Sequence, residues 1–295
     1  MIDGFINFYK ETGGTSHRAV AEVRRILQLQ RVGHMGTLDP AAEGVLPLAI
    51  GRATRLISFV EGDTKEYQAE LVLGLATNTW DTTGEIAATT DASHLTERLV
   101  AQVLPHFVGR ISQEPPMFSA IKVGGRKLVD LARQGLDIVR ERRAVVVHSI
   151  EIIEWRADTE RPIAVLKIHC SKGTYVRSLC KEIGAMLGVP ACMGKLMRTA
   201  SGPFHLAESV SLAEFRDCPE RHIRPIDSYL LSFPKTVIDA SAGARFMCGQ
   251  RLPMENLPAG EFAVFSGSRC VGLGIDRGGL LIPTLVLSRE ENRKC

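Results

Sequence analysis

Residues 31–55 of this chain, RVGHMGTLDPAAEGVLPLAIGRATR, carry glycine or proline at six positions. This density is incompatible with a long helix, because glycine adds backbone freedom and proline removes a hydrogen-bond donor. Polar side chains such as His34 and Asp39 stand in an otherwise glycine-rich and apolar context. We therefore predict that residues 29–55 form a structured loop that holds polar residues in place.

The sequence around this segment mixes helical and strand patterns. Ser16 can cap a helix that runs to about Gln28, since apolar residues recur there at helical spacing. Further helices are expected over 95–104, 128–134 and 173–187. Alternating or β-branched residues predict strands over 67–73, 145–153 and 163–170. Because the two types do not alternate strictly, the expected fold class is α+β.

The composition changes after about residue 232. The tail contains many glycines and short strand-like runs, at 262–265 and 280–287. About 60 residues suffice for a small domain. We predict one domain over 1–232 and a small β-rich domain over 233–295, with the boundary near Phe233–Pro234.

Several functional classes lack sequence support. The chain has no GxxxxGK[ST], GxGxxG, HExxH or GxSxG motif, and its seven cysteines include no CxxC pair. Neither a metal nor a nucleotide cofactor is therefore expected. The N-terminus resembles no signal peptide and no apolar stretch is long enough to span a bilayer. We expect a cytoplasmic chain that does not associate with membranes.

Charge is distributed unevenly, although the net charge is only +3. Residues 61–100 are acidic, whereas residues 110–143 and 161–207 carry a clear excess of lysine and arginine. Two basic segments on one face would suit a polyanion such as RNA, whereas the same charges could also be balanced in three dimensions.

Three residues could carry chemistry. Asp39 precedes Pro40, which favours an extended backbone; a carboxylate there can act as nucleophile or base, or simply open a turn. Arg177, at the start of an expected helix, can hold a carboxylate ionised or contact a phosphate. Tyr67 heads an expected strand, where packing is its other plausible role.

These motifs match one family over nearly the whole chain. The segment 31–55 resembles the signature of the TruB family of tRNA pseudouridine-55 synthases. The family's other motifs resemble, in the same order, TSHRAV (15–20), KEYQAELVLG (65–74), NTWDTTG (78–84), PPMFSAIKVGGRKLVDLARQG (115–135), CSKGTYVRSLCKEIG (170–184) and LMRTASGPF (196–204). Two positions depart from the family pattern: Glu11 follows Lys10 where a proline is usual, and Met197 replaces a common arginine.

The resemblance implies a catalytic domain around a mixed, largely antiparallel sheet, followed by a PUA-like RNA-binding domain. It implies that a uridine in the TΨC loop of tRNA is flipped out and isomerised to pseudouridine. The N1 glycosidic bond breaks, the uracil turns, and the base rejoins the ribose through C5. Atoms are conserved, so the reaction needs no cofactor or metal.

The resemblance also assigns residues. Asp39 is the essential carboxylate, Arg177 pairs with it and lowers its pKa, and Tyr67 stacks on the flipped uracil and helps to remove the C5 proton. Asp39 could act at the ribose or at C6 of the uracil. The residues expected to bind substrate are His34, Tyr175, Leu196, Asp81, Arg55 and Arg198.

Three other functions stay open at this point. A glycosidase would need a second carboxylate as its acid, and Glu43 is the only acid near Asp39 in sequence. A non-catalytic RNA-binding protein could use the same scaffold. A guide-RNA-dependent relative would be expected to carry lysine-rich extensions, which this chain lacks. We expect a monomer that acts on the TΨC stem-loop without an obligate protein partner.

Overall fold

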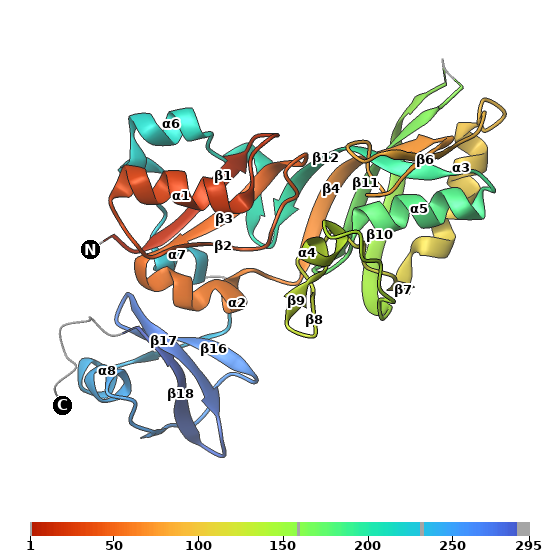
Figure 1. The fold of residues 1–295 in the computed structure, drawn as a ribbon. Helices are drawn as coiled ribbons and strands as arrows, with labels where there is room; N and C mark the ends of the chain where they lie inside the picture. The colour runs from red at the N-terminus through yellow and green to blue at the C-terminus, as the bar shows by residue number, and fades with distance from the viewer. Residues whose placement is uncertain (1, 158–159, 231–232, 288–295) are drawn as a thin grey trace.

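The computed structural model describes residues 2–157, 160–230 and 233–287. A nine-stranded sheet runs through the larger part of the molecule (Figure 1). Its strands span Gly4–Lys10 (β1), Val32–His34 (β2), Glu43–Ile50 (β3), Thr64–Leu73 (β4), Gly109–Gln113 (β7), Arg143–Arg156 (β10), Ile163–Ser171 (β11), Ala191–Ser201 (β12) and Phe204–His205 (β13).

The order across this sheet is β1-β3-β12-β4-β11-β10-β7, with β2 beside β3 and β13 beside β12. Every pairing is antiparallel except the short contact of β12 with β3. The strands predicted over 67–73, 145–153 and 163–170 lie in β4, β10 and β11. The mixed sheet and its helices confirm the α+β class.

The prediction of a loop over 29–55 was wrong in part. Only the stretch around Asp39 is a loop, because β2 precedes it and β3 and a 3-10 helix, Gly51–Leu56 (η1), follow it. All but the first residue of β3 are buried, so its apolar run is that of an interior strand. Pro47 is tolerated where the β2 ladder ends, and its carbonyl accepts a hydrogen bond from the Met35 amide.

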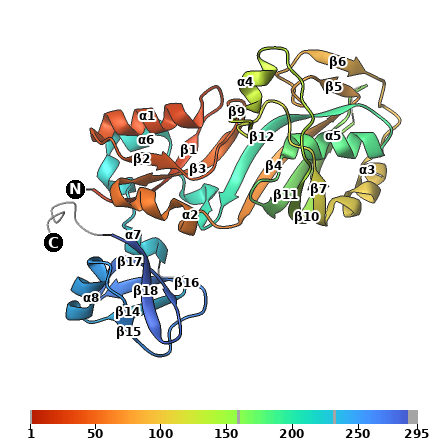
Figure 2. The same cartoon turned by 60° about the horizontal axis from the view of Figure 1, so that its bottom comes forward.

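The helices cover parts of the sheet and connect its strands. They span Ser16–Leu27 (α1), Ile57–Val60 (α2), Glu97–Val103 (α3), Leu128–Ala132 (α4), Val176–Met186 (α5), Leu212–Asp217 (α6), Ile226–Leu230 (α7) and Ala240–Met247 (α8). Further 3-10 turns span Leu104–Phe107 (η2), Leu206–Glu208 (η3) and Pro219–His222 (η4). Figure 2 shows α5 lying across the sheet near β12 and β4.

Two predicted helix starts differ from those observed. Thr15, not Ser16, caps α1: its side chain accepts a hydrogen bond from the Arg18 amide. The side chain of Ser16 instead turns inward and bonds to Leu38. Helix α5 begins at Val176, because Gly173 has a left-handed backbone (φ 82°) that no helix accommodates.

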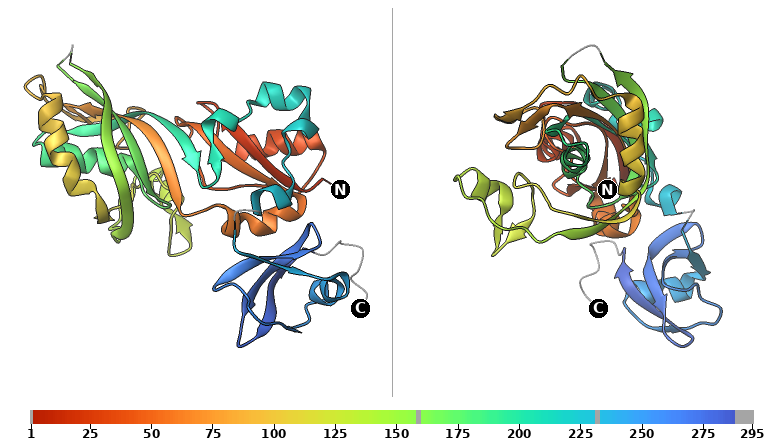
Figure 3. Two further views of the ribbon diagram at one scale, coloured as in Figure 1. Left: turned by 180° about the vertical axis from the view of Figure 1, so that it is seen from behind. Right: turned by 90° about the vertical axis from the view of Figure 1, so that its right-hand side faces the viewer.

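Two smaller units leave the main sheet. An arm, residues 114–142, contains α4 and the hairpin Lys122–Val123 (β8) and Arg126–Lys127 (β9), and packs around its own small apolar cluster. The end-on view in Figure 3 shows the arm projecting to one side. A second hairpin joins Leu75–Thr77 (β5) to Ile86–Thr89 (β6).

The C-terminal part forms its own five-stranded sheet beside α8. Its strands span Lys235–Ile238 (β14), Leu252–Pro253 (β15), Glu261–Ser266 (β16), Arg269–Asp276 (β17) and Leu280–Val286 (β18). Apolar residues of this sheet pack against α7, which joins it to the larger unit. No helix in the described part of the chain is long and apolar enough to cross a membrane.

Candidate active site

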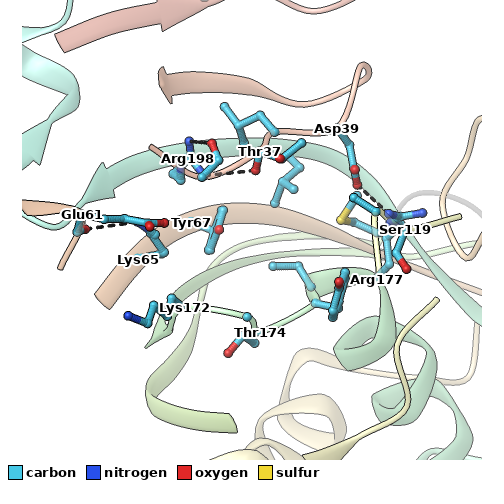
Figure 4. Close-up of a pocket in the computed structure, with 18 residues that line it drawn as sticks. Thr37, Asp39, Glu61, Lys65, Tyr67, Ser119, Lys172, Thr174, Arg177 and Arg198 are labelled. Carbon is cyan, nitrogen blue, oxygen red and sulfur yellow. Dashed lines mark hydrogen bonds and ion pairs between the residues drawn. The ribbon is translucent and has the colours of Figure 1, made fainter. Parts of the chain in front are cut away.

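A pocket of about 250 Å³ opens between the Asp39 loop, β4, β12, the start of α5 and the arm (Figure 4). Six of the nine residues expected to form the site line it: Asp39, Tyr67, Tyr175, Arg177, Leu196 and Arg198. They come from segments far apart in sequence, which the sheet brings to one place.

Asp39 lies on a loop that is tied down from several sides. The Asp39 carbonyl accepts a hydrogen bond from the Ala42 amide, which closes a turn with Pro40 as its second residue. The Ser16 hydroxyl bonds to both the amide and the carbonyl of Leu38. The buried Lys10 ammonium donates to the carbonyls of Ala42 at 2.5 Å and Pro40 at 3.3 Å. The carboxylate is therefore held in a fixed position.

Arg177 pairs directly with Asp39. Its Nη2 lies 2.8 Å from Asp39 Oδ2, and the arginine itself is buried. The guanidinium also donates to the carbonyls of Phe118, at 2.9 Å, and Thr79, at 3.3 Å. Arg177 thus joins the Asp39 loop, the arm and the segment before Asp81, and these contacts fix the direction in which it presents its charge.

Arg177 lowers the pKa of Asp39, as predicted, but burial outweighs this effect. Burial raises the pKa of the Asp39 carboxyl above its ordinary value, and the charge of Asp81 adds to this. The Arg177 and Lys10 cations oppose the rise but do not cancel it. The side chain still keeps 37% of its surface exposed, on the pocket side, so it remains accessible.

Asp81 stands behind this pair. Its Oδ2 lies 3.7 Å from Arg177 Nη1, and its Oδ1 accepts hydrogen bonds from Thr79 and from the amide and hydroxyl of Thr83. Asp81 is buried and does not line the pocket. Its position is that of a group that orients Arg177, and its bonds with Thr79 and Thr83 also stabilise the turn in which it lies.

Tyr67 and Arg198 face each other on β4 and β12. Burial raises the pKa of the Tyr67 phenol. The Arg198 side chain, 1% exposed, donates to the carbonyls of Val45, Gly36 and Thr37. Arg198 therefore lies in the pocket wall, where it ties the Asp39 loop to the sheet.

The other predicted residues take different places. Tyr175 directly precedes α5, and Leu196 on β12 is buried; both line the pocket. His34 ends β2, two residues before the pocket residue Gly36. Arg55 lies away from the pocket and donates a hydrogen bond to the Val286 carbonyl, at the end of the C-terminal sheet.

The pocket residues that sequence reasoning did not assign to the site include Lys65, Glu61, Ser119 and Lys172. The Lys65 ammonium is buried, donates to Ser201 Oγ at 2.8 Å and lies 3.4 Å from Glu61 Oε1. Burial lowers the pKa of Lys65 to about 8. Strand alternation could have predicted Lys65 as a pocket residue, because a residue two positions before Tyr67 lies on the same face of the strand.

The part of the chain that the structure describes contains no cluster of three potential metal ligands. The six cysteines in these residues are thiols and form no disulfide with one another.

Comparisons with known proteins identify relatives that match nearly the whole length of this chain. Residues 24–176 match the family model "TruB family pseudouridylate synthase (N terminal domain)" and residues 177–231 match "tRNA pseudouridylate synthase B C-terminal domain". A protein named tRNA pseudouridine synthase B from Symbiobacterium thermophilum is 45% identical over 84% of this chain and 82% of its own length. One of the same name from Carboxydothermus hydrogenoformans is 42% identical over 97% and 98%.

Solved structures show the same fold. A chain in a structure of an H/ACA RNP bound to a substrate RNA containing 2′-deoxyuridine superimposes with a TM-score of 0.73 at 27% identity, covering 98% of this chain and 86% of its own. A chain from a crystal structure of a Cbf5-Nop10-Gar1 complex gives 0.72 at 28% identity, covering 96% and 84%.

Proposed function

This chain belongs to the TruB family of pseudouridylate synthases, and we propose that it isomerises the uridine at position 55, in the TΨC loop of tRNA, to pseudouridine. The observation that carries the proposal is the ion pair between Asp39 and Arg177, 2.8 Å apart, at the edge of a pocket that Tyr67 also lines. A carboxylate, its partner cation and an aromatic platform are the groups that this reaction needs.

A base inside an RNA loop must leave its stack to reach this pocket, at a cost of a few kcal/mol that stacking and phosphate contacts offset. Tyr67 and Leu196 supply apolar surface for the flipped uracil. Because burial raises its pKa, the Tyr67 phenol stays protonated, which supports stacking over proton removal as its main role.

We assign to Asp39 the replacement of the N1–C1′ bond by a C5–C1′ bond. As a carboxylate it acts either at the ribose or at C6 of the uracil, and the N1–C1′ bond breaks. The base turns, C5 bonds to C1′, and the proton on C5 is released as N1 gains one. Arg177 works against the raised pKa of Asp39 and keeps more of the carboxyl ionised.

We assign different roles to the two predicted domains. Residues 1–232 hold the pocket, and we assign residues 233–295 to binding a more distant part of the tRNA. The basic segments 110–143 and 161–207 border the pocket through the arm and α5, where they can contact phosphates. We assign His34 and Tyr175 to RNA contacts at or beside the pocket, and Arg55 to a contact farther away, beside the C-terminal sheet.

We further propose that the enzyme acts in the cytoplasm as a monomer without an obligate protein partner. The relative from Carboxydothermus hydrogenoformans matches 97% of this chain over 98% of its own length, and its name mentions no partner protein. The structural neighbour Cbf5 occurs in complexes with Nop10 and Gar1, which makes a requirement for a partner the alternative to be tested.

The test is tritium release from a TΨC stem-loop labelled at C5 of the target uracil, with EDTA present. We expect release with the wild-type protein and a loss of about 10³-fold or more with Asp39→Asn. Asp217→Asn, an exposed aspartate on α6, serves as the matched control and should retain full activity.

Two outcomes would contradict the proposal. Release of free uracil without pseudouridine would favour a glycosidase. Binding of the stem-loop with no release by the purified wild-type chain would favour a pure RNA-binding role or dependence on a protein partner.

A further inference from the structure

Two histidines form an aromatic pair near the pocket. His34 ends β2, and His17 projects from the first turn of α1. Their ring centroids are 5.3 Å apart with an angle of 74° between planes, which is an edge-to-face contact. His34 is half-buried, whereas His17 is exposed. His34 interacts electrostatically with Arg198 and Glu61, which both line the pocket, so the pair stands beside it.

The two ring nitrogens of His34 differ in their surroundings. Nδ1 is buried, and within the described residues nothing forms a hydrogen bond with it. A neutral imidazole carries one proton and leaves its other nitrogen bare. A buried N–H without an acceptor is costly, so the proton belongs on Nε2 and Nδ1 is left bare. A second proton would have to occupy Nδ1, where nothing accepts it.

The charges around His34 also favour the neutral ring. Burial lowers the pKa of His34, and the nearby His17 and Arg198 lower it further. Glu61 is the one group that opposes them. These three neighbours come from α1, β12 and the segment between α2 and β4, so they surround the ring with a net positive field.

We infer that His17 is a positioning residue: it holds a neutral His34 ring, with its proton on Nε2, at the edge of the pocket for contact with an RNA base. The inference rests on the proposed function, since RNA is the expected ligand. Histidine rings stack on unpaired bases. An uncharged ring loses less hydration on stacking than an imidazolium cation does. Since no described residue orients this ring through a hydrogen bond to Nδ1, the contact with His17 takes that part.

The activity test compares His17→Phe with His17→Ala. Phenylalanine retains an aromatic edge, whereas alanine removes it, and the exposed site tolerates both. We expect His17→Ala to raise KM for the stem-loop roughly two- to tenfold with kcat almost unchanged. His17→Phe should stay near wild type at pH 8. His94→Ala, an exposed histidine before α3, is the matched control.

The inference is overturned if His17→Ala leaves KM unchanged, or if His17→Phe loses as much as His17→Ala. A uniform fall in kcat for both variants would also count against it.

A second test needs no turnover. Nitrogen chemical shifts of the imidazoles in the RNA-free protein should show His34 protonated on Nε2, with its pKa below the ordinary value of 6.5. His17→Phe removes a like charge while retaining the burial, so the pKa of His34 should rise. An Nδ1–H tautomer, or a pKa unaffected by His17→Phe, would overturn the inference. Because these readouts are independent of tritium release, failure of the proposed function can be recognised separately.

Discussion

Arg177 shows how much one buried side chain can connect. Its guanidinium contacts the Asp39 carboxylate, the Phe118 carbonyl of the arm and the Thr79 carbonyl, with the Asp81 carboxylate behind it. Five fixed donors allow arginine to do this, whereas a lysine ammonium has no planar fork. The electrostatic state of Asp39 and the position of the arm therefore depend on the same residue.

This arrangement predicts the pH dependence of Arg177 variants. The raised pKa of Asp39 places the acidic limb of kcat/KM above the ordinary aspartate value of 3.8. Arg177→Gln removes a cation that favours the ionised carboxyl, so the limb should move to higher pH by about one unit or more. Arg177→Lys should move it less, although its kcat also falls. Tritium release measured across pH checks this, and an unmoved limb for Arg177→Gln would contradict it.

At the scale of elements, cation–π contacts and ion pairs attach both ends of the arm to α5 and to Trp80. Trp80 has a left-handed backbone (φ 63°), and its ring lies 3.8 Å from Lys181 Nζ on α5 and 5.3 Å from Arg140 Cζ on the arm. Glu114, at the other end of the arm, pairs with Arg140 at 2.7 Å and lies 3.7 Å from Lys181 Nζ. These contacts hold Ser119 and Ala120 of the arm at the pocket.

Replacing Trp80 should therefore loosen the arm. Each cation–π contact contributes about 0.5–2 kcal/mol, so Trp80→Leu should lower kcat/KM roughly tenfold and speed tryptic cleavage at exposed basic residues of the arm. Trp155→Leu, on β10, serves as the control for loss of a tryptophan. Equal cleavage rates in the Trp80 variant and the wild type would show that the contacts of Trp80 with Lys181 and Arg140 do not restrain the arm.

At the scale of the molecule, charged residues fix the C-terminal sheet to the larger unit. Arg52 binds both oxygens of Asp3 through its amide and side chain, and its Nη1 donates to the Leu287 carbonyl at 3.1 Å. The Cys270 amide donates to Asp227 Oδ1 at 2.8 Å. Together with the apolar contacts of α7, these bonds set the distance between the pocket and the tail domain.

These contacts between the larger unit and the C-terminal sheet predict that an Arg52 variant loses activity on one substrate more than on another. If residues 233–295 bind a distant part of the tRNA, Arg52→Ala should lower kcat/KM for full-length tRNA several-fold and leave the isolated stem-loop nearly unaffected. Arg25→Ala, on the exposed side of α1, is the matched control. The ratio of the two kcat/KM values is the measurement, and an equal loss on both substrates would indicate a general effect on stability instead.

Local patterns in the sequence were sufficient for several elements, whereas the roles predicted for Asp39, Tyr67 and Arg177 came from the family resemblance. Strand alternation placed β4 and with it Tyr67, and the glycine-rich setting of Asp39 predicted a stiff loop. These inferences succeed because side-chain period and turn chemistry act over a few residues. The same reasoning failed for β3, where burial by β1, β2 and β12 outweighs the glycine and proline content.

Only the tertiary structure decided how distant residues meet. The pairing of Arg177 with Asp39, the enclosure of Arg198 by loop carbonyls and the contact of His17 with His34 all join segments separated along the chain. The upward shift of the Asp39 pKa also depends on the tertiary structure. Desolvation depends on every neighbour that excludes water and not on the residues beside Asp39 in sequence. The sequence by itself determined the chemistry available to this protein, and long-range packing determined its charge states and geometry.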